Sequence, residues 1–242
     1  SPSVILYTED QLEDLKSFCT TGRIWMGIDK TYNLGELLLT AIVYKNLAVY
    51  RKGTADHPVF VGPILLHGTS TVDVFHHFLA SVAIALNTKF QDMVIGSDDE
   101  KALTQAIQQA FPSCQAALCT RHLITNTTRH LRDKVGAASK ERGHLVDKVF
   151  GPHGLIKSDD EMTFELKKDQ LEPEWPATDA KYFKKLTTQL RDHVLKLHWN
   201  GSLEAGWTNN AAESANHVLK HMVEWKAQPL PSLVSMLHDK VQ

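Results

Sequence analysis

The chain has 242 residues, of which 43% are hydrophobic and 22% are charged, and its formal net charge at neutral pH is −2. This composition is typical of a globular domain with a sizeable core, and it excludes a disordered chain and a protein coated in positive charge. No apolar run reaches the length of about 20 residues that crosses a bilayer, and the three cysteines suggest no disulfide framework. We therefore expect no membrane partner and a reducing compartment.

Three strands are predicted in the first third of the chain. The runs "IWMGID" (24–29) and "ELLLTAIVY" (36–44) are separated by a turn, which is the pattern of a hairpin. A third strand is predicted in "HPVFVGPILLH" (57–67), where Pro63 favours an edge position or a β-bulge. Apolar positions over 71–86 then recur at helical spacing, which predicts a helix.

Helices and strands alternate in the next part of the chain. A short buried strand is predicted over 91–96, and the helix after it begins with Ser97 and Glu100, the spacing of a capping box. A fifth strand is predicted in "QAALCT" (115–120), followed by a helix from about 120 to 134. This order predicts an α/β fold with a mixed five-stranded sheet covered by helices on both faces.

Beyond residue 136 only helical patterns appear. We predict that 1–135 is the core, that 136–206 is an all-helical insertion, and that 207–242 is a C-terminal helical part of the core. The inward positions of the insertion are predicted to be Phe183, Leu186, Leu190 and Val194. The buried stripe of the last helix is predicted to be Ala212, Ala215, Leu219 and Met222.

Three carboxylates stand where such a fold gathers functional side chains. Asp29 ends the first predicted strand, Asp98 follows the fourth, and Glu213 lies near the start of the helix after the insertion. If the first and fourth strands lie side by side, their ends bring Asp29 and Asp98 together, and a helix beside that edge can present Glu213 to both. Each acid also has a structural explanation, because Asp is common in turns and acids favour the first turn of a helix.

Four blocks, in order along the chain, resemble the catalytic domain of the Mutator-like element (MULE) transposases. They are "GIDKTYNLGELLLTAIVYKN", "HPVFVGPILLH", "GSDDEKALTQAIQQAFPSCQAALCTRHLITN" and "TNNAAESANHVLKHMVEWK". The resemblance covers residues 24 to about 240, apart from the helical insertion. It implies a ribonuclease H-like fold with an Asp, Asp, Glu triad at Asp29, Asp98 and Glu213, and it assigns the catalytic role to Asp98 rather than to Asp99.

The resemblance also implies an activity, its cofactors and its partners. A DDE transposase cleaves DNA strands at transposon ends and transfers them to target DNA, and two Mg²⁺ (or Mn²⁺) ions held by the triad would serve that chemistry. Hard oxygen ligands suit these cations. The implied partners are double-stranded DNA and further copies of the same chain, and the implied location is the nucleus.

Two further groups of residues are candidates for supporting roles. Cys119 and His122 form the Cys-x-x-His element of the third block, but two ligands do not make a zinc site, and both residues are also ordinary core residues. The most basic region of the chain runs from Arg121 to Arg142. Its candidate DNA-binding residues are Arg121, Arg129, Arg132 and Lys134. A helix face that is exposed to solvent would carry the same charges without any role in DNA binding.

Two other functions remain open at this stage. One is a domesticated descendant of a transposase that binds DNA or regulates transcription without cutting it. The other is a helical scaffold that uses the insertion and the last helix as an oligomer interface. Retention of all three acids favours the enzyme.

Overall fold

The computed structural model describes residues 3–19, 25–31, 37–88, 90, 93–203, 208, 210–222, 226 and 228–241. The chain forms two compact units, one of Ser1–Ala116 with Asn209–Gln242 and the other of Ala117–Thr208. The helical unit thus begins at Ala117, whereas the sequence pattern placed the start of the insertion at residue 136. No helix among these described residues is long and apolar enough to span a membrane.

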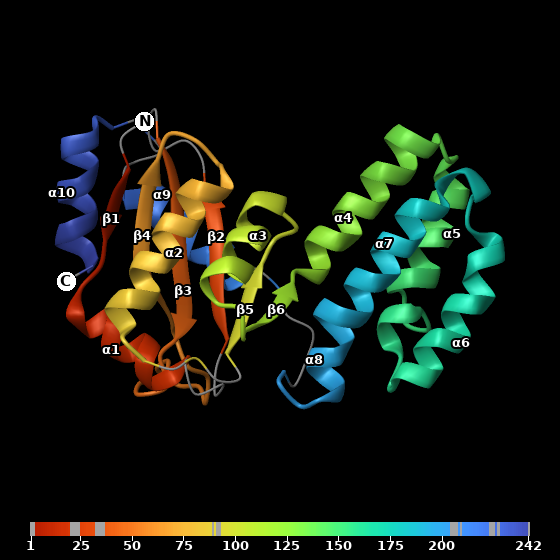
Figure 1. The fold of residues 1–242 in the computed structure, drawn as a ribbon, viewed down its shortest axis with the longest axis horizontal. Helices are drawn as coiled ribbons and strands as arrows, with labels where there is room; N and C mark the ends of the chain where they lie inside the picture. The colour runs from red at the N-terminus through yellow and green to blue at the C-terminus, as the bar shows by residue number, and fades with distance from the viewer. Residues whose placement is uncertain are drawn as a thin grey trace. The chain divides into compact units, whose positions relative to one another are not determined.

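The first unit is built on a mixed sheet with helices on both faces (Figure 1). Its elements are β1 (Val4–Leu6), α1 (Glu9–Phe18), β2 (Met26–Thr31), β3 (Leu38–Lys45), β4 (Val59–His67), α2 (Val72–Leu86), β5 (Val94–Ser97), α3 (Lys101–Ala110), α9 (Asn210–Met222) and α10 (Leu230–Val241), and β6 (Gln115–Leu118) crosses the boundary between the units.

The six strands lie in the order β1-β4-β3-β2-β5-β6. The pairs β1 with β4, β4 with β3 and β3 with β2 are antiparallel, and β2 with β5 is parallel. The predicted hairpin and the mixed sheet are confirmed. The first and fourth predicted strands (β2 and β5) are neighbours, which meets the condition for bringing Asp29 and Asp98 together. The sheet has one strand more than predicted, because β1 is only three residues long and too short to show a period.

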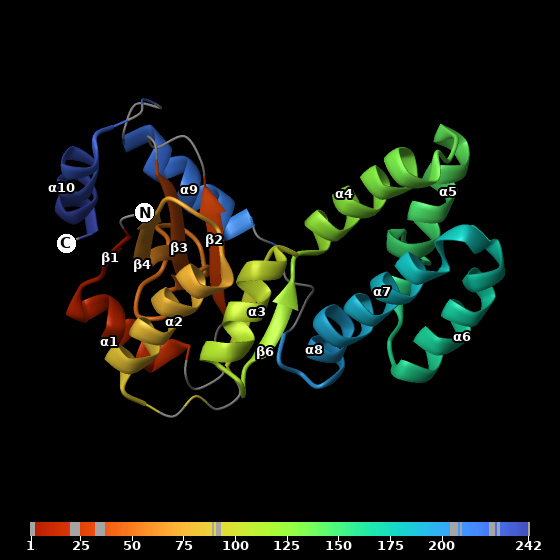
Figure 2. The same cartoon turned by 45° about the horizontal axis from the view of Figure 1, so that its top comes forward.

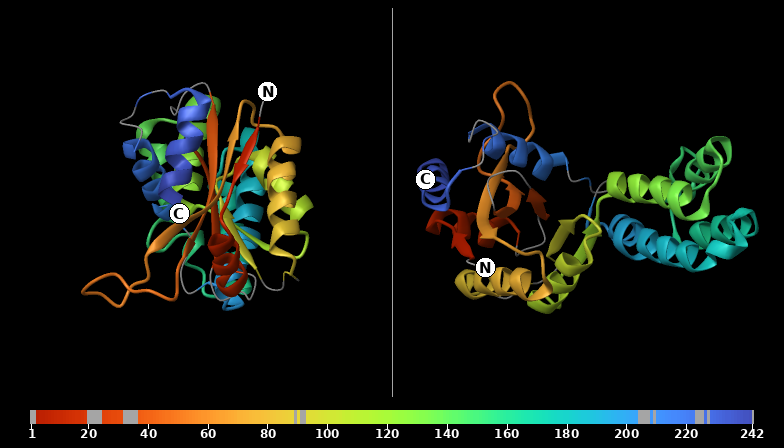
Figure 3. Two further views of the ribbon diagram at one scale, coloured as in Figure 1. Left: turned by 90° about the vertical axis from the view of Figure 1, so that its left-hand side faces the viewer. Right: turned by 90° about the horizontal axis from the view of Figure 1, so that it is seen from above.

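The two faces of the sheet bury different side chains. Alternate residues of β2 and β3, such as Ile28 and Ile42, pack with the apolar stripes of α1, α2 and α3. On the opposite face Leu39 packs with Leu219, Leu233 and other residues of α9 and α10. Figure 3 shows this sheet edge-on between its two helical layers. The α/β architecture with helices on both faces therefore follows the predicted pattern.

Pro63 lies at a β-bulge inside the sheet. The register of β3 with β4 shifts between Ala41, which pairs with Ile64, and Val43, which pairs with Val61. One residue of β3 therefore faces two of β4, Gly62 and Pro63, as in a bulge. β1 pairs with β4 only over Ile64–Leu66, so Pro63 lies at the bulge and just outside the stretch of β4 that β1 covers.

Apart from the last residues of β6, the regular secondary structure of the second unit is helical among its described residues (Figure 2). Its main elements are α4 (Thr120–His130), which continues as the π-helical turn Leu131–Val135, α5 (Ser139–Phe150), α6 (Glu161–Leu171), α7 (Ala180–Leu190), the π-helical turn Arg191–Leu195 and α8 (Lys196–Trp199). The predicted inward positions of α7 are buried, as are Leu145 of α5 and Phe164 of α6, and they form one core.

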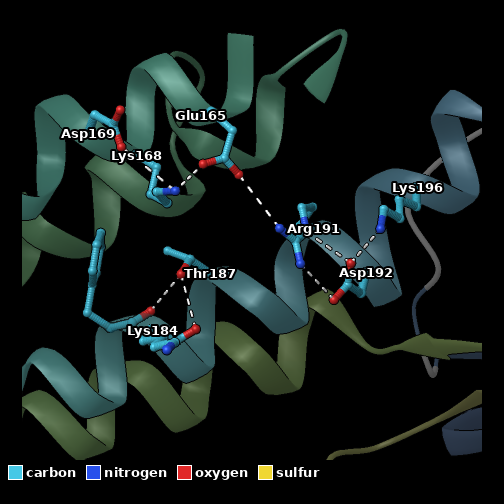
Figure 4. Close-up of polar contacts among 9 residues, drawn as sticks. Glu165, Lys168, Asp169, Lys184, Thr187, Arg191, Asp192 and Lys196 are labelled. Carbon is cyan, nitrogen blue, oxygen red and sulfur yellow. Dashed lines mark hydrogen bonds and ion pairs between the residues drawn. The ribbon is translucent and has the colours of Figure 1, made fainter. Parts of the chain in front are cut away.

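An ion-pair chain joins α6 to the end of α7 (Figure 4). Glu165 of α6 pairs with Lys168 and lies 3.8 Å from Arg191, and Arg191 pairs with Asp192 at 3.0 Å. Lys196 lies 2.9 Å from the same Asp192 carboxylate. Hydrogen bonds from Arg191 and Lys196 lower the pKa of Asp192 to about 2, so the chain stays charged at neutral pH.

Some predicted features lie outside the described residues. These are the first residue of the first predicted strand, the turn at 32–36, the start of the strand at 91–92 and the side chain of Met222. The other members of the last buried stripe, Ala212, Ala215 and Leu219, are buried as predicted.

Candidate functional site

Asp29 and Asp98 occupy matching positions on two paired parallel strands. Met26 pairs with Ile95 and Gly27 with Gly96, so each aspartate comes two residues after the Gly27–Gly96 pair. Neighbouring strands lie about 4.8 Å apart, and residues at the same register of a parallel pair face the same side. Asp29 lies within β2 and Asp98 directly follows β5, so the register brings the two backbone segments side by side at this point of the sheet.

Helix α9 makes direct contact with Asp29. The helix packs on β2 and β3, with Ala212 and Ala215 against Val43. Asn216 of α9 donates a hydrogen bond from its Nδ2 to Oδ2 of Asp29 over 2.7 Å. Asp29 is only 8% exposed, so this amide compensates part of the cost of burying a carboxylate.

Glu213 lies one helical turn before Asn216 on α9. Residues three apart lie on the same face of a helix, so Glu213 shares the face that meets Asp29. The glutamate is half-buried and lies in the first turn of the helix, where the helix dipole favours a negative charge. All three predicted acids thus belong to one unit, in which the Asn216–Asp29 bond joins α9 to β2.

The surroundings of Asn216 Oδ1, the second polar atom of this side chain, indicate whether a cation fits beside Asp29. Asn216 is 6% exposed, and its Oδ1 has no hydrogen-bond partner among the described residues. A buried acceptor without a partner costs about 1 to 3 kcal/mol, which a cation or a water bound to one would offset. Since carboxylate and amide oxygens are the ligands that Mg²⁺ and Mn²⁺ prefer, the donor set fits such an ion.

The structure does not show a ready-made cluster of ligands. Among the described residues, no group of three or more His, Cys, Asp and Glu side chains is arranged to hold a metal ion.

A buried ion pair joins the two acid-bearing segments on the other face of the sheet. Nζ of Lys30, the residue after Asp29, lies 2.6 Å from Oε1 of Glu100, and the two side chains are 9% and 22% exposed. The same Nζ donates to Ser70 Oγ over 3.1 Å and lies 5.9 Å from the ring centre of Phe75. The pair ties the end of β2 to the start of α3, and so restrains the segments that carry Asp29 and Asp98.

This ion pair explains why the predicted capping box is wrong. Helix α3 begins at Lys101 with Glu100 as its N-cap, and no side chain caps it. The hydroxyl of Ser97 donates to the backbone oxygen of Asp98 over 3.0 Å, while the Glu100 carboxylate is engaged by Lys30. The long-range ion pair has replaced the local cap.

His67 lies beside this ion pair and is fully buried. Its Nδ1 donates to the backbone oxygen of Thr69 over 2.8 Å, and its Nε2 therefore accepts from the Thr40 hydroxyl over 2.9 Å. Burial is the main cause that lowers the pKa of His67, and the charge of Lys30 lowers it further, although Glu100 and the Thr69 bond oppose them. His67 is thus a neutral structural histidine.

Cys119 and His122 belong to the helical unit. Cys119 is 1% exposed and is the N-cap of α4, but its side chain accepts no capping hydrogen bond from the backbone of the first turn. His122 is half-buried in the first turn of that helix. None of the three cysteines forms a disulfide, and burial raises the pKa of Cys19 to about 12 and that of Cys114 to about 11, so these two thiols are unreactive at neutral pH.

The four candidate DNA-binding residues are exposed on α4 and the turn after it. Arg129 donates a hydrogen bond to the side-chain oxygen of Asn126 over 2.8 Å. Because Asn126 is neutral, this contact does not neutralise the positive charge of Arg129. Arg132 instead pairs with its neighbour Asp133 at 2.6 Å, so the net charge of this pair is zero. Among the four, Arg132 is therefore the weakest candidate for a phosphate contact.

Sequence reasoning missed Asn216, Lys30 and Glu100 as parts of this site. Asn216 had a signal, since a polar side chain three residues after Glu213 shares its helix face. Lys30 and Glu100 had none, because a strand residue and a helix cap 70 positions apart become partners only through the pairing of β2 with β5.

No protein-family model matches the sequence, and no curated protein matches it. The likeness to the MULE transposases therefore stands on the four sequence blocks quoted above, and the function is argued from the site itself.

Proposed function

We propose that this chain is the catalytic domain of a DDE-type DNA transposase of the MULE kind, with a ribonuclease H-like sheet as its core. Its reaction would be metal-dependent cleavage of DNA at transposon ends, followed by transfer of the freed strand to target DNA. The catalytic and metal-holding residues would be Asp29, Asp98 and Glu213.

One observation carries the proposal, the hydrogen bond from Asn216 to Asp29 over 2.7 Å. It brings the helix that carries Glu213 against the end of β2, and β2 is paired in parallel with the strand that leads to Asp98. Two neighbouring strand ends and one covering helix thus supply the three acids in the order in which the sequence blocks predict them. A structural role alone would not require a buried carboxylate and an unsatisfied amide oxygen at the same place.

The residues of the site would have the following roles in the reaction. Two Mg²⁺ or Mn²⁺ ions, when bound, would activate the attacking oxygen and stabilise the leaving oxygen of the phosphodiester. Asp29 would contribute to both ion positions, while Asp98 and Glu213 would each contribute to one. Asn216 would hold the Asp29 carboxylate in place through Nδ2 and offer Oδ1 to an ion or its water. Lys30 and Glu100 act through the backbone as positioning residues.

The proposed partners follow from this reaction. Double-stranded DNA is the substrate, both as transposon end and as target, and Arg121, Arg129 and Lys134 are proposed phosphate contacts. Cleavage at two ends of one element requires two active sites, so we propose a homo-oligomer for the active form. The proposed location is the nucleus, as the resemblance to the MULE transposases implies.

The test is strand cleavage by the full-length parent protein on its terminal repeats, with Mg²⁺ or Mn²⁺. The wild type should nick the ends, and Asp29→Asn, Asp98→Asn and Glu213→Gln should each lose this activity while they retain DNA binding. Specific binding without cleavage by the wild type would support the domesticated alternative. Neither binding nor cleavage would support the helical scaffold.

A further inference from the structure

The helical unit contains a groove of about 670 Å³ between α4 and α7. Residues that line it include His130 of α4 and, on α7, Lys181, Tyr182, Lys184 and Lys185. Its size lies within the range of small-molecule sites in proteins, which is about 300 to 1,000 Å³. Most of the surface of the groove is apolar, although three cations stand on its wall.

Two stacked rings form a planar surface in this groove. The rings of His130 and Tyr182 lie 3.7 Å apart between centroids, with an interplanar angle of 7°. His130 Nε2 is held by Asp179 Oδ1 at 2.9 Å, and the Tyr182 hydroxyl is held by Thr127 Oγ1 at 3.1 Å. Each ring is therefore fixed at its polar end, and the pair is preorganised to receive another flat ring.

The charge of the groove is positive. Lys181, Lys184 and Lys185 are exposed on one side of α7. The acid among the lining residues, Asp179, is already shared by His130 and by Trp175 Nε1, which donates to its Oδ2 over 3.2 Å. The groove thus combines an aromatic surface with cations, the two features that bind the base and the phosphate of a nucleotide.

We propose that this groove binds a single-stranded nucleic-acid segment, with a base against the His130–Tyr182 pair and phosphates at the three lysines. A strand in a duplex keeps its bases stacked on one another, so the aromatic surface selects an unpaired base. The inference concerns residues of the helical unit alone, and it does not depend on the carboxylate site or on a metal.

The test is fluorescence anisotropy of a labelled 12-nucleotide oligo-dT with the whole chain in EDTA. The triple variant Lys181→Gln, Lys184→Gln, Lys185→Gln should weaken binding at least tenfold. It should also flatten the dependence of log K on log salt by about 2, since each phosphate contact on a single strand contributes about 0.7. A charge-matched control, Lys140→Gln, Lys148→Gln, Lys157→Gln, removes three exposed lysines of the same unit outside the groove.

The ring pair is tested separately. Tyr182→Leu should weaken binding several-fold with an unchanged salt slope, whereas Tyr182→Phe, which keeps the ring, should bind as the wild type does. Thermal unfolding of each variant identifies losses of affinity that come from misfolding. Where a variant misfolds, quenching of the tyrosine fluorescence of the wild-type protein on addition of oligo-dT replaces the affinity measurement.

Several results would overturn the proposal. They are equal losses in the two lysine triples, tighter binding of a matched duplex than of oligo-dT, equal affinity for free dTMP, and no quenching on addition of oligo-dT. The binding assay runs in EDTA, where metal-dependent cleavage does not occur, so a failure of the cleavage test and a failure of this one are distinguishable.

Discussion

Asn216 donates a hydrogen bond of 2.7 Å to Asp29 across 187 residues of sequence, and both side chains are buried. The bond connects α9 to β2. Oδ1 of the same amide has no hydrogen-bond partner among the described residues. A buried carboxylate and an amide oxygen that accepts no hydrogen bond thus lie at the same place, and a cation bound there would contact both.

The first prediction concerns this amide. Asn216→Asp places a second negative charge beside Asp29, so the variant should unfold at a lower temperature than the wild type in EDTA. Mn²⁺ should restore it, because a cation between two carboxylates removes their repulsion. Differential scanning fluorimetry across a Mn²⁺ titration measures both effects. A variant whose midpoint falls and does not respond to Mn²⁺ would contradict a cation site, and Asn216→Ala serves as the control without added charge.

The second prediction separates the two adjacent aspartates. Asp98→Asn should reduce strand cleavage by about a thousandfold or more, since loss of a metal ligand removes several kcal/mol of transition-state stabilisation. Asp99→Asn should retain most of the activity. The unfolding midpoint of each variant, measured by differential scanning fluorimetry, separates a loss of activity from a loss of the fold. Equal cleavage by wild type and Asp98→Asn would show that Asp98 is not a ligand.

The third prediction concerns the buried pair of Lys30 and Glu100. Lys30→Met and Glu100→Gln should each lower the free energy of unfolding by about 1 to 3 kcal/mol, because each leaves a mostly buried charge without its partner. The double variant should lose less than the sum of the two, and chemical denaturation of all four proteins measures this coupling.

The exposed pair of Lys45 and Asp56, 3.2 Å apart, is the matched control for that experiment. Water screens an exposed pair, so Lys45→Met and Asp56→Asn should be nearly additive. Additive losses at Lys30 and Glu100 as well would mean that the buried pair does not hold the two segments together. A positioning role further predicts weaker Mn²⁺ binding in Lys30→Met than in Lys45→Met.

The fourth prediction is a pH dependence of stability from His67. Its pKa in the folded protein is below the ordinary value of about 6.5, so at lower pH the unfolded chain binds a proton that the folded protein does not. Stability should therefore be fully present above about pH 6.5 and should fall as the pH decreases below it.

A pair of variants isolates that contribution. His67→Gln should be less stable than the wild type at pH 7.5 and should lose less stability between pH 7.5 and pH 5.5, as measured by urea denaturation. His77→Gln, at an exposed position of α2, should keep the wild-type slope. An unchanged slope in His67→Gln would show that His67 does not titrate in this range.

Local patterns predicted much of the sheet. Alternating and apolar runs indicated β2, β3, β4, β5 and β6, because side chains of a strand face opposite sides with a period of two. The helical stripes of α2, α3, α7 and α9 were predicted for the same kind of reason, since a helix buries residues three and four apart. That the first and fourth predicted strands are neighbours was only a condition of the sequence argument, and the pairing of β2 with β5 in the sheet supplies it.

Other features had no local signal. The strand β1 has three residues and gains its pairing from β4, so only the assembled sheet defines it. The start of α3 was mispredicted because Glu100 has two possible partners, the nearby cap and the distant Lys30, and the buried ion pair is the stronger of the two.

The sequence by itself determined which residue types stand at the strand ends and on the helix faces, since period and composition depend on neighbours along the chain. The tertiary structure alone decided that Asn216 meets Asp29, that Lys30 meets Glu100 and that His130 stacks on Tyr182. These contacts join residues 187, 70 and 52 positions apart, taking the last as 182 − 130. Their geometry depends on how whole elements pack, because a change of one residue in strand register or of one turn in helix position would separate each pair.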